Sequence, residues 1–293
     1  MLARSCRPSA GGPLGPRLRL SAQPLRRVGR YALLVFAAFV VLVPIYSAFV
    51  LSLQPAENLL EFPGILIPTD PTFGTFGEAF DKGSLDRYLV NSAIVSILIT
   101  AGQVVTSILA AYAFAFLRFR GKKVLFMVFI ATLMVPAEVT LVANYQTIDS
   151  LGWLDSYQGL TVPFLAFAFG TFLLRQAFLG VPQDLRDASA LDGYGHWGFM
   201  RNVAVPLARP SIAALAVFSF LLAWNQYLWP LLITNREDYR TVQIGLKSLA
   251  SSNIAEFNLV MAGTVIAALP IFVLLVIFQR HLVRGLTSGA IKG

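Results

Sequence analysis

The chain has 293 residues, of which 56% are hydrophobic and only 13% are charged, whereas soluble globular domains contain about 45–50% apolar and about 25% charged residues. This composition excludes an intrinsically disordered chain and leaves no room for a large soluble catalytic domain beside several membrane helices. One cysteine, Cys6, and two histidines exclude an internal disulfide and a Cys/His metal cluster. We therefore expect an all-α membrane protein with no metal site.

Five stretches of 19 to 30 residues lack Asp, Glu, Lys and Arg, and a sixth apolar segment contains a single acid, Glu138. A bilayer-crossing helix needs about 20 apolar residues, so each stretch predicts one transmembrane helix. None alternates apolar and polar residues as a transmembrane β-strand does. The expected spans are 31–53, 88–117, 124–145, 159–179, 210–234 and 258–279.

The distribution of Lys and Arg predicts the orientation of these six spans. Both termini share one side of the membrane, and the segments on that side hold 18 of the 23 basic residues. The positive-inside rule places that side in the cytoplasm. We expect a basic cytoplasmic tail over 1–30, a six-span transmembrane domain over 31–279 and a cytoplasmic tail over 280–293. This topology and the anionic lipid headgroups that face the cytoplasmic segments explain the net charge of +8. Nucleic acid is therefore not an expected partner.

Proline lies inside five of the six expected spans. Each proline removes a backbone hydrogen bond and tends to kink its helix, which membrane proteins tolerate where a neighbouring helix or a cavity satisfies the freed carbonyl. Two interpretations stay open: a moving, cavity-forming bundle, or the ordinary enrichment of proline in membrane helices. The five residues are Pro44, Pro136, Pro163, Pro230 and Pro270.

The loop 184–210 is the most informative segment. Its first part predicts a short amphipathic helix with Leu185, Ala188 and Leu191 on one face, and Asp192-Gly193 predicts its end. A second apolar segment then leads to Pro206 and Pro210, directly before the fifth span. This pattern predicts a helix–turn–helix on the membrane surface that docks on another protein; the alternative is a plain connecting loop.

Polar side chains inside the spans indicate a substrate path. Asn225 and Trp229 lie four residues apart, which places them on one face of a continuous helix, and amides beside aromatic rings suit a polar, partly apolar ligand. The alternative is that the aromatic residues form an interfacial belt and the amides join helices. Glu138, at membrane depth, either contacts substrate or pairs with a neighbouring helix or permease. The candidate residues are Asn225, Gln226, Tyr227, Trp229 and Glu138.

The loop 184–210 resembles the EAA loop of the permease subunits of bacterial ABC importers. In that pattern Asp187-Ala188-Ser189 stands for E-A-A, Asp192-Gly193 for the central pair, and Pro206 and Pro210 for the two prolines. The chain departs from it by Asp187, Ser189 and Tyr194, where Glu, Ala and a small residue are usual. From about residue 30 onward the chain is similar to the six-span, MetI-like permeases of maltose-type carbohydrate importers, and within them to the second permease of sn-glycerol-3-phosphate and glycerophosphodiester importers. Stretches at 117–126, 130–139, 154–163, 172–178, 224–232 and 279–286 carry this likeness.

The resemblance implies a transport subunit of the bacterial inner membrane rather than an enzyme. An extracytoplasmic binding protein would deliver the substrate, a second, non-identical permease would complete the path, and a dimer of ATPase subunits, holding ATP and Mg²⁺, would dock on 184–210. This chain lacks a GxxxxGK[ST] phosphate loop, so the partner would hydrolyse the ATP and this chain would bind no cofactor. The alternative cargo is a disaccharide such as trehalose or maltose.

Two other classes of protein are weaker alternatives. An ion-coupled secondary transporter would show internal repeats or an ion site in the membrane, for which only Glu138 is available. An intramembrane enzyme would need a catalytic set at membrane depth, yet every aspartate and both histidines lie outside the expected spans.

Overall fold

The computed structural model describes residues 23–59, 67–68, 70–250 and 256–287, and these residues form helices and turns without a strand. Helices suit such apolar stretches because each helix satisfies its own backbone groups, as a bilayer requires. The α-helices are α1 (Gln23–Leu53), α2 (Gly74–Lys82), α3 (Leu85–Phe116), α4 (Lys122–Ala131), α5 (Leu141–Ser150), α6 (Tyr157–Thr161), α7 (Ala168–Leu179), α8 (Gln183–Leu191), α9 (His196–Phe199), α10 (Val205–Leu207), α11 (Arg209–Trp224), α12 (Leu228–Ile233), α13 (Val242–Leu249) and α14 (Phe257–Thr287). The shorter turns are η1 (Ala56–Asn58), η2 (Thr132–Met134), η3 (Ala137–Thr140), η4 (Val162–Phe164), the π-helical η5 (Met200–Ala204) and η6 (Glu237–Tyr239).

Three helices are individually long and apolar enough to cross a membrane: Arg27–Leu53 of α1, all of α3, and Phe257–Arg280 of α14. They correspond to three of the expected spans. The helix α1 begins at Gln23, however, inside the segment 1–30 expected to be a cytoplasmic tail before the first span. Residues 1–22 of that tail, and 288–293 of the expected C-terminal tail, lie outside the described residues.

The remaining candidate spans are pairs of shorter helices. The expected spans 124–145 and 159–179 are bent by 91° and 48°, and a third pair, bent by 77°, joins α9–α10 to α11. By length and composition, the described residues therefore supply three spans, or up to six if each bent pair counts as one.

Of the five prolines inside the expected spans, two coincide with breaks between paired helices. Pro136 directly precedes η3, between α4 and α5, and Pro163 lies in η4, between α6 and α7. By contrast, Pro44 and Pro270 lie inside the continuous helices α1 and α14, and Pro230 lies in the first turn of α12, where a missing backbone N–H leaves no intrahelical bond unmade. Proline alone does not decide where a helix ends in this chain.

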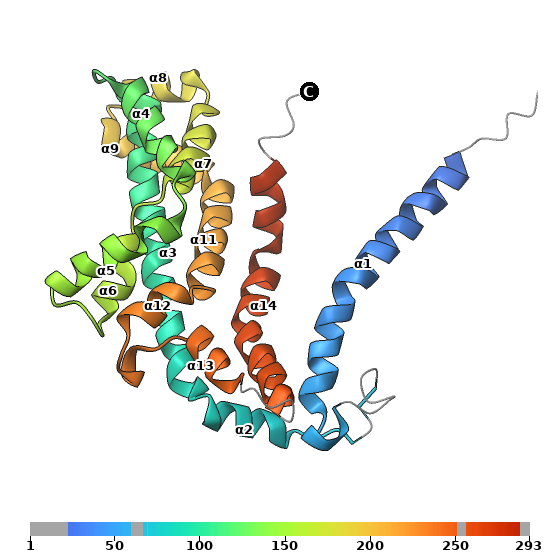
Figure 1. Cartoon of the computed structure of the whole chain (residues 1–293). Helices are drawn as coiled ribbons and strands as arrows, with labels where there is room; N and C mark the ends of the chain where they lie inside the picture. The colour runs from blue at the N-terminus through green and yellow to red at the C-terminus, as the bar shows by residue number, and fades with distance from the viewer. Residues whose placement is uncertain (1–22, 60–66, 69, 251–255, 288–293) are drawn as a thin grey trace, which may run out of the picture. The chain divides into compact units, whose positions relative to one another are not determined.

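The chain divides into two units that meet within α1, after Ser47. In the first unit the apolar side chains of α1 from Val28 to Val43 are exposed. In the second unit α3 packs against α7 and α11, and α11 packs against α14. Within this unit α3 runs from α2 and α13 at one end, here named the α13 end, to α8 and α9 at the other, here named the α8 end (Figure 1).

A close approach of α3 and α7 organises the core of the second unit. A Cβ atom at Gly170 in α7 would lie 2.4 Å from Ser107 Oγ in α3 and 3.0 Å from the Leu215 side chain in α11. Small residues at such points let helix backbones pack closely in lipid. Toward the α8 end this packing buries a cluster made of Ala111, Tyr112, Leu174, Phe178, Phe199, Met200, Ala204, Ala208 and Leu215. The loop 184–210 supplies four of these residues, so it is built into the core rather than loosely attached.

Candidate functional site

The loop 184–210 folds as the predicted helix–turn–helix. At the end of α8, Tyr194 N donates to Ser189 O (2.9 Å) and Gly193 N donates to Ala190 O (3.1 Å), which is the Schellman arrangement of a helix C-terminus. Gly193 has φ +81°, a left-handed conformation that side-chain-bearing residues rarely adopt. The predicted stop at Asp192-Gly193 is therefore present.

The second half of the loop is irregular. It consists of α9, the π-helical stretch η5 and α10. Pro206 and Pro210 each lie in the first turn of the helix that follows, α10 and α11 respectively. Between these helices the chain bends by 77°, so the two prolines flank the bend at which the loop turns into α11.

Tyr112 joins this loop to α3. Its hydroxyl donates to the carbonyl oxygen of His196 (2.9 Å) and lies 3.2 Å from His196 Nδ1. Its ring contacts the rings of Phe116, Phe178 and Phe199, and the Arg186 guanidinium of α8 lies 5.9 Å from the Phe116 ring centre. Both helical parts of the loop are thus fixed to the last turns of α3.

The opposite face of the loop is exposed and partly apolar. Leu191 is 90% exposed and Trp197 is 66% exposed, and Leu185 and Tyr194 are also exposed. Asp187 and Ala188 lie on this open side, whereas Ser189 is buried and its hydroxyl donates to Arg186 O (2.8 Å). The expected amphipathic face of α8 therefore exists, and in this chain alone nothing covers it within the described residues. Such a face is typical of a surface that docks on another protein.

The five candidate substrate residues line one hollow of about 340 Å³. It lies where the break between α11 and α12 meets η3 and α5. Glu138 is exposed and makes no ion pair with another described residue. The Gln226 Oε1 atom is buried without a hydrogen-bond partner among the described residues. The sequence did not single out the five other lining residues, Thr140, Leu141, Asn144, Phe164 and Leu228.

One prediction about this hollow is wrong: Asn225 and Trp229 do not lie on one face of a continuous helix. The helix α11 ends at Trp224, and α12 begins at Leu228. Side chains stabilise the break, because Asn225 Nδ2 donates to Leu221 O (2.8 Å) and Gln243 Nε2 donates to Trp224 O (3.4 Å). Irregular backbone in a membrane protein is tolerated where such partners or a cavity receive the freed groups.

Trp229 is a wall of the hollow rather than a hydrogen-bond donor to a ligand. It is buried, its indole N–H donates to Gly159 O (3.1 Å), and its ring packs edge-on against Phe164 with centres 5.7 Å apart. Of the five candidates, Asn225, Gln226 and Glu138 bring an amide or carboxylate group to the hollow, and Asn144 adds a further amide. Among the described residues no group of three or more His, Cys, Asp or Glu could hold a metal ion.

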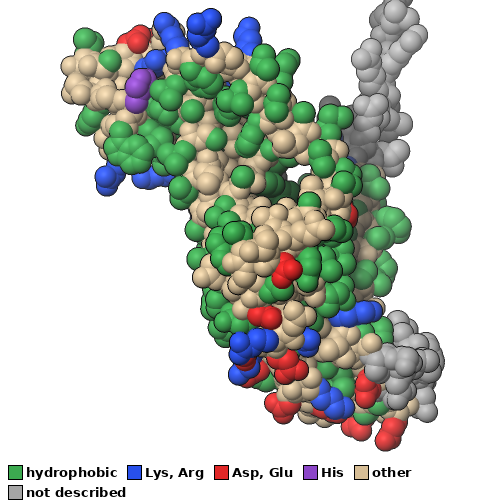
Figure 2. Space-filling view, turned by 60° about the vertical axis from the view of Figure 1, so that its left-hand side comes forward, with side chains coloured by type: hydrophobic (Ala, Val, Ile, Leu, Met, Phe, Trp, Pro, Cys, Tyr) green, Lys and Arg blue, Asp and Glu red, His purple; other side chains and the backbone are tan. Residues whose placement is uncertain are grey.

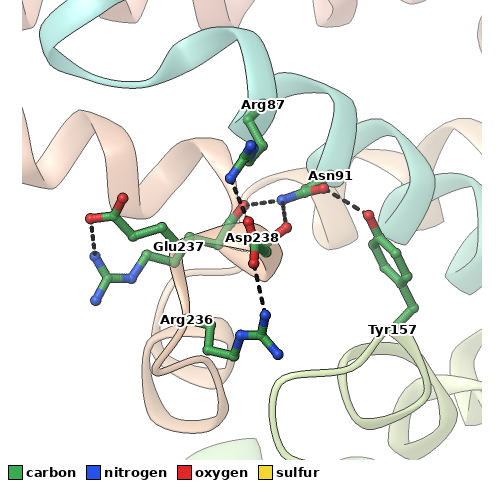
Figure 3. Close-up of polar contacts among 7 residues, drawn as sticks. Arg87, Asn91, Tyr157, Arg236, Glu237 and Asp238 are labelled. Atoms are coloured by element: carbon green, nitrogen blue, oxygen red, sulfur yellow. Dashed lines mark hydrogen bonds and ion pairs between the residues drawn. The ribbon is translucent and has the colours of Figure 1, made fainter.

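A polar network that the sequence analysis did not identify lies at the α13 end (Figure 3). The buried Asn91 of α3 donates to Asp238 O (2.8 Å) and Arg240 O (2.9 Å) and accepts from the Tyr157 hydroxyl (2.8 Å). Arg87 and Arg236 both pair with the Asp238 carboxylate. The network fixes the segment 236–240 to α3 and α6. An amide inside a predicted span was the only available signal, and it does not reveal its partners.

Comparison with known proteins identifies the family. Residues 103–288 match the family model described as binding-protein-dependent transport system inner membrane component. The sn-glycerol-3-phosphate transport system permease protein UgpE of Agrobacterium fabrum is 38% identical over 275 residues, which cover 91% of this chain and 98% of the relative. The protein of the same description from Yersinia pestis is 35% identical over 267 residues, covering 88% and 95%.

Solved structures show the same fold. A chain of a bacterial ABC transporter involved in the import of the acidic polysaccharide alginate superposes with a TM-score of 0.79 at 22% identity, covering 90% of this chain and 99% of that one. A chain of a bacterial alginate transporter in complex with its pentasaccharide-bound periplasmic protein gives a TM-score of 0.66 at 16% identity, covering 89% and 96%. The chain belongs to the binding-protein-dependent transport system inner membrane components, and it is a permease subunit of an ABC importer.

Proposed function

We propose that this permease moves sn-glycerol-3-phosphate or a related glycerophosphodiester into the cytoplasm. The observation that carries the proposal is the 38% identity to the sn-glycerol-3-phosphate permease of Agrobacterium fabrum along nearly the whole of both chains. Similarity of this extent covers the substrate-path segments as well as the loop 184–210.

The importer would contain three further protein components besides this chain. A second, non-identical permease would complete the substrate path, an extracytoplasmic binding protein would deliver the substrate, and an ATPase dimer would hold ATP and Mg²⁺. The periplasmic protein bound to the alginate transporter supports the second of these. In this arrangement six spans cross the inner membrane, with both termini and the loop 184–210 in the cytoplasm, because that side carries most of the Lys and Arg.

The exposed face of α8 would dock on the ATPase. Leu185, Leu191 and Trp197 would supply the apolar contacts, and Asp187, Ala188, Ser189, Asp192 and Gly193 would set the shape of the docking helix and its turn. Pro206 and Pro210 would fix the bend toward α11. The permease would have two states, one outward-facing and one inward-facing. Closure of the ATPase on ATP would act through the loop 184–210 and change the relative populations of these two states.

Tyr112 would transmit that movement. The loop 184–210 cannot move far without α3, because the Tyr112–His196 hydrogen bond and the aromatic cluster around it join the two. The other end of α3 holds the segment 236–240 through Asn91. A shift of the docking loop would therefore reach the far end of the permease through one unbroken helix of 32 residues.

The hollow beside the break at 225–227 would form part of the substrate path. Asn225, Gln226 and Asn144 can exchange hydrogen bonds with hydroxyl groups, and Tyr227 and Trp229 offer apolar walls. Neither Lys nor Arg lines this hollow. A phosphate group would have to be neutralised elsewhere along the path, so this chain would contact the glycerol portion of the substrate.

The absence of Lys and Arg from the lining of the hollow favours a second candidate cargo, a disaccharide such as trehalose or maltose. A hollow with amides, aromatic rings and one carboxylate but no cation also suits a neutral sugar. The two cargoes differ in the charge that the whole path must accommodate, so direct uptake measurements separate them.

The test is uptake of radiolabelled sn-glycerol-3-phosphate, glycerophosphocholine and trehalose by cells with and without the gene for this chain. An energy-poisoned sample of each serves as the control. We expect deletion to abolish the energy-dependent uptake of the phosphorylated polyols alone, and re-expression to restore it. Loss of trehalose uptake alone would show that the cargo is a disaccharide rather than a phosphorylated polyol. Unchanged uptake of all three compounds would reject both candidate cargoes.

A further inference from the structure

A basic groove runs beside α4 at the α8 end of the second unit. Two hollows of about 430 Å³ and 410 Å³ share Lys122 and Lys123 as lining residues. Arg118 lines the first hollow, and Arg175 of α7 lines the second. These four cations define the groove, and no Asp or Glu lines either hollow.

Two of the four cations are held in place by α3. Lys122 Nζ donates to Leu117 O (2.9 Å) and Ala115 O (3.2 Å). Arg175 Nε donates to Phe114 O (3.1 Å), and its guanidinium lies 4.3 Å from the centre of the Phe126 ring. These contacts use one N–H of Arg175, and the terminal nitrogens have no hydrogen-bond partner among the described residues. The groove is therefore built from positioned cations with donor capacity to spare.

The positive charge of the groove is not balanced within the described part of the chain. All five ion pairs of the described residues lie at the α13 end, and none includes Arg118, Lys122, Lys123 or Arg175. In Figure 2 Lys and Arg side chains predominate at the upper end, where an acidic side chain is also visible, whereas acidic and basic side chains are mixed at the lower end. Clustered cations without counter-charges attract an anion from outside the chain.

Apolar side chains adjoin the cations on α4. Val124 is 65% exposed and lines the first hollow, and Met127 is 70% exposed and lines the second. A soluble phosphate or nucleotide would leave these side chains in water, whereas a phospholipid carries apolar chains beside its charged headgroup. Basic pockets between membrane helices are a recognised mode of binding anionic lipid headgroups.

We propose that this groove binds the phosphate headgroup of an anionic membrane phospholipid. The headgroup lies against Arg118, Lys123 and the free nitrogens of Arg175, and an acyl chain lies along Val124 and Met127. The bound lipid neutralises the groove where α3, α4 and α7 meet and so stabilises the packing directly beside the loop 184–210. This inference concerns a permanent site for lipid and does not depend on the identity of the transported substrate.

The experiment uses the full chain, with its partner subunits, in phosphatidylcholine nanodiscs that contain a photoactivatable phosphatidylglycerol. Cross-linked peptides are identified by mass spectrometry. We expect labelling at 117–127 and near Arg175. Lys123→Gln is the test variant, because Lys123 is exposed and makes no hydrogen bond or ion pair among the described residues, so its loss leaves the fold intact. Removing one such cation should lower the labelling about fivefold.

Arg120→Gln is the matched control. Arg120 lies three residues before Lys123, in the turn that precedes α4, and carries the same charge, yet it lines neither hollow. Labelling by phosphatidylglycerol should be unchanged in this variant and should resist an excess of inorganic phosphate. Equal losses in both variants would show diffuse attraction to an anionic surface and would overturn the site. Displacement by inorganic phosphate would make the ligand a soluble anion, and absence of labelling at these segments would also reject the proposal.

Discussion

The two ends of α3 satisfy their polar and charged groups in opposite ways. At the α13 end, Asn91 makes three hydrogen bonds, and every ion pair of the described residues lies there. At the α8 end the described cations have no carboxylate partner, and large apolar side chains such as Leu191 and Trp197 are open. The polar groups of the α13 end are thus satisfied within this chain, whereas we expect the open groups of the α8 end to be covered by other molecules. Variants at the α8 end should therefore damage assembly and coupling, and variants at the α13 end should damage the fold.

The largest effect is expected from Gly193→Trp. The left-handed backbone at φ +81° costs a side-chain-bearing residue about 1–2 kcal/mol, and the indole would project from the turn of the docking loop. Because no other atom lies within 4 Å of a Cβ placed there, the core is not overpacked. Loss of a docking contact worth about 2 kcal/mol corresponds to roughly thirtyfold lower uptake. ATP-dependent uptake and copurification of the ATPase are the measurements.

Gly195→Ala is the control for that variant. Gly195 lies two residues away with φ −74°, and a Cβ there also meets nothing within 4 Å. Its uptake should equal that of the original chain. Normal uptake by Gly193→Trp itself would contradict the proposal that the loop 184–210 docks on the ATPase.

On stability rather than transport, the largest effect is expected from Asn91→Ala, which tests whether the α13 end is held together by contacts within this chain. The variant leaves two backbone carbonyls and the Tyr157 hydroxyl without their partner. Unsatisfied buried groups of this kind should lower the free energy of unfolding by about 2–4 kcal/mol. Thermal unfolding of the purified permease in detergent measures the loss.

Asn235→Ala is the control, because the exposed Asn235 side chain makes no hydrogen bond among the described residues. This variant should unfold at the same temperature as the unsubstituted protein. If both variants unfolded alike, the network would be incidental to stability.

The contrast between the two ends also shows what sequence alone can predict. Charge-free runs located α3 and the membrane-spanning part of α14 to within a few residues, because the bilayer demands length and apolarity whatever the tertiary contacts. The stop at Asp192-Gly193 was predictable for a local reason, since glycine accepts the left-handed turn. Such features depend on nearby residues only.

Features that depend on distant partners were not predictable. The break at 225–227 interrupts an apolar run that contains neither Gly nor Pro at that point. It persists because Gln243, 19 residues further along the chain, caps a freed carbonyl, and because Trp229 bonds to Gly159, 70 residues away. Sequence alone does not show which distant segments meet. Glu138 and Asn225 could therefore each be proposed as a substrate residue, but the hollow that both of them line could not be predicted.

Tyr112→Phe tests the connection from the loop 184–210 to α3. The ring and its aromatic contacts remain, and only the hydrogen bonds to His196 are lost. A hydrogen bond worth about 1 kcal/mol shifts a coupling equilibrium roughly fivefold, so the substrate imported per ATP hydrolysed should fall by about that factor. The unfolding temperature should change little. The readout is the ratio of uptake to ATP hydrolysis in proteoliposomes.

Tyr145→Phe provides the matched control. Tyr145 is half-buried beside a different apolar cluster and its hydroxyl makes no hydrogen bond among the described residues. The ratio of uptake to hydrolysis should be unaltered. An unaltered ratio in Tyr112→Phe as well would show that the loop communicates with α11 through the bend at Pro206 and Pro210 rather than through α3.

The smallest effect is expected from Arg87→Gln, which separates the contribution of the ion pair from that of the buried amide at the α13 end. Arg87 pairs with Asp238 beside the Asn91 network, but both side chains are about half exposed. Exposed ion pairs contribute about 0–1 kcal/mol because water and salt screen them. Arg236 also remains beside the same carboxylate. The unfolding temperature should therefore fall only slightly, and the small difference should vanish in high salt, whereas the loss in Asn91→Ala should persist. A loss in Arg87→Gln as large as that in Asn91→Ala would mean that ion pairs, rather than the buried amide, hold the segment 236–240 on α3.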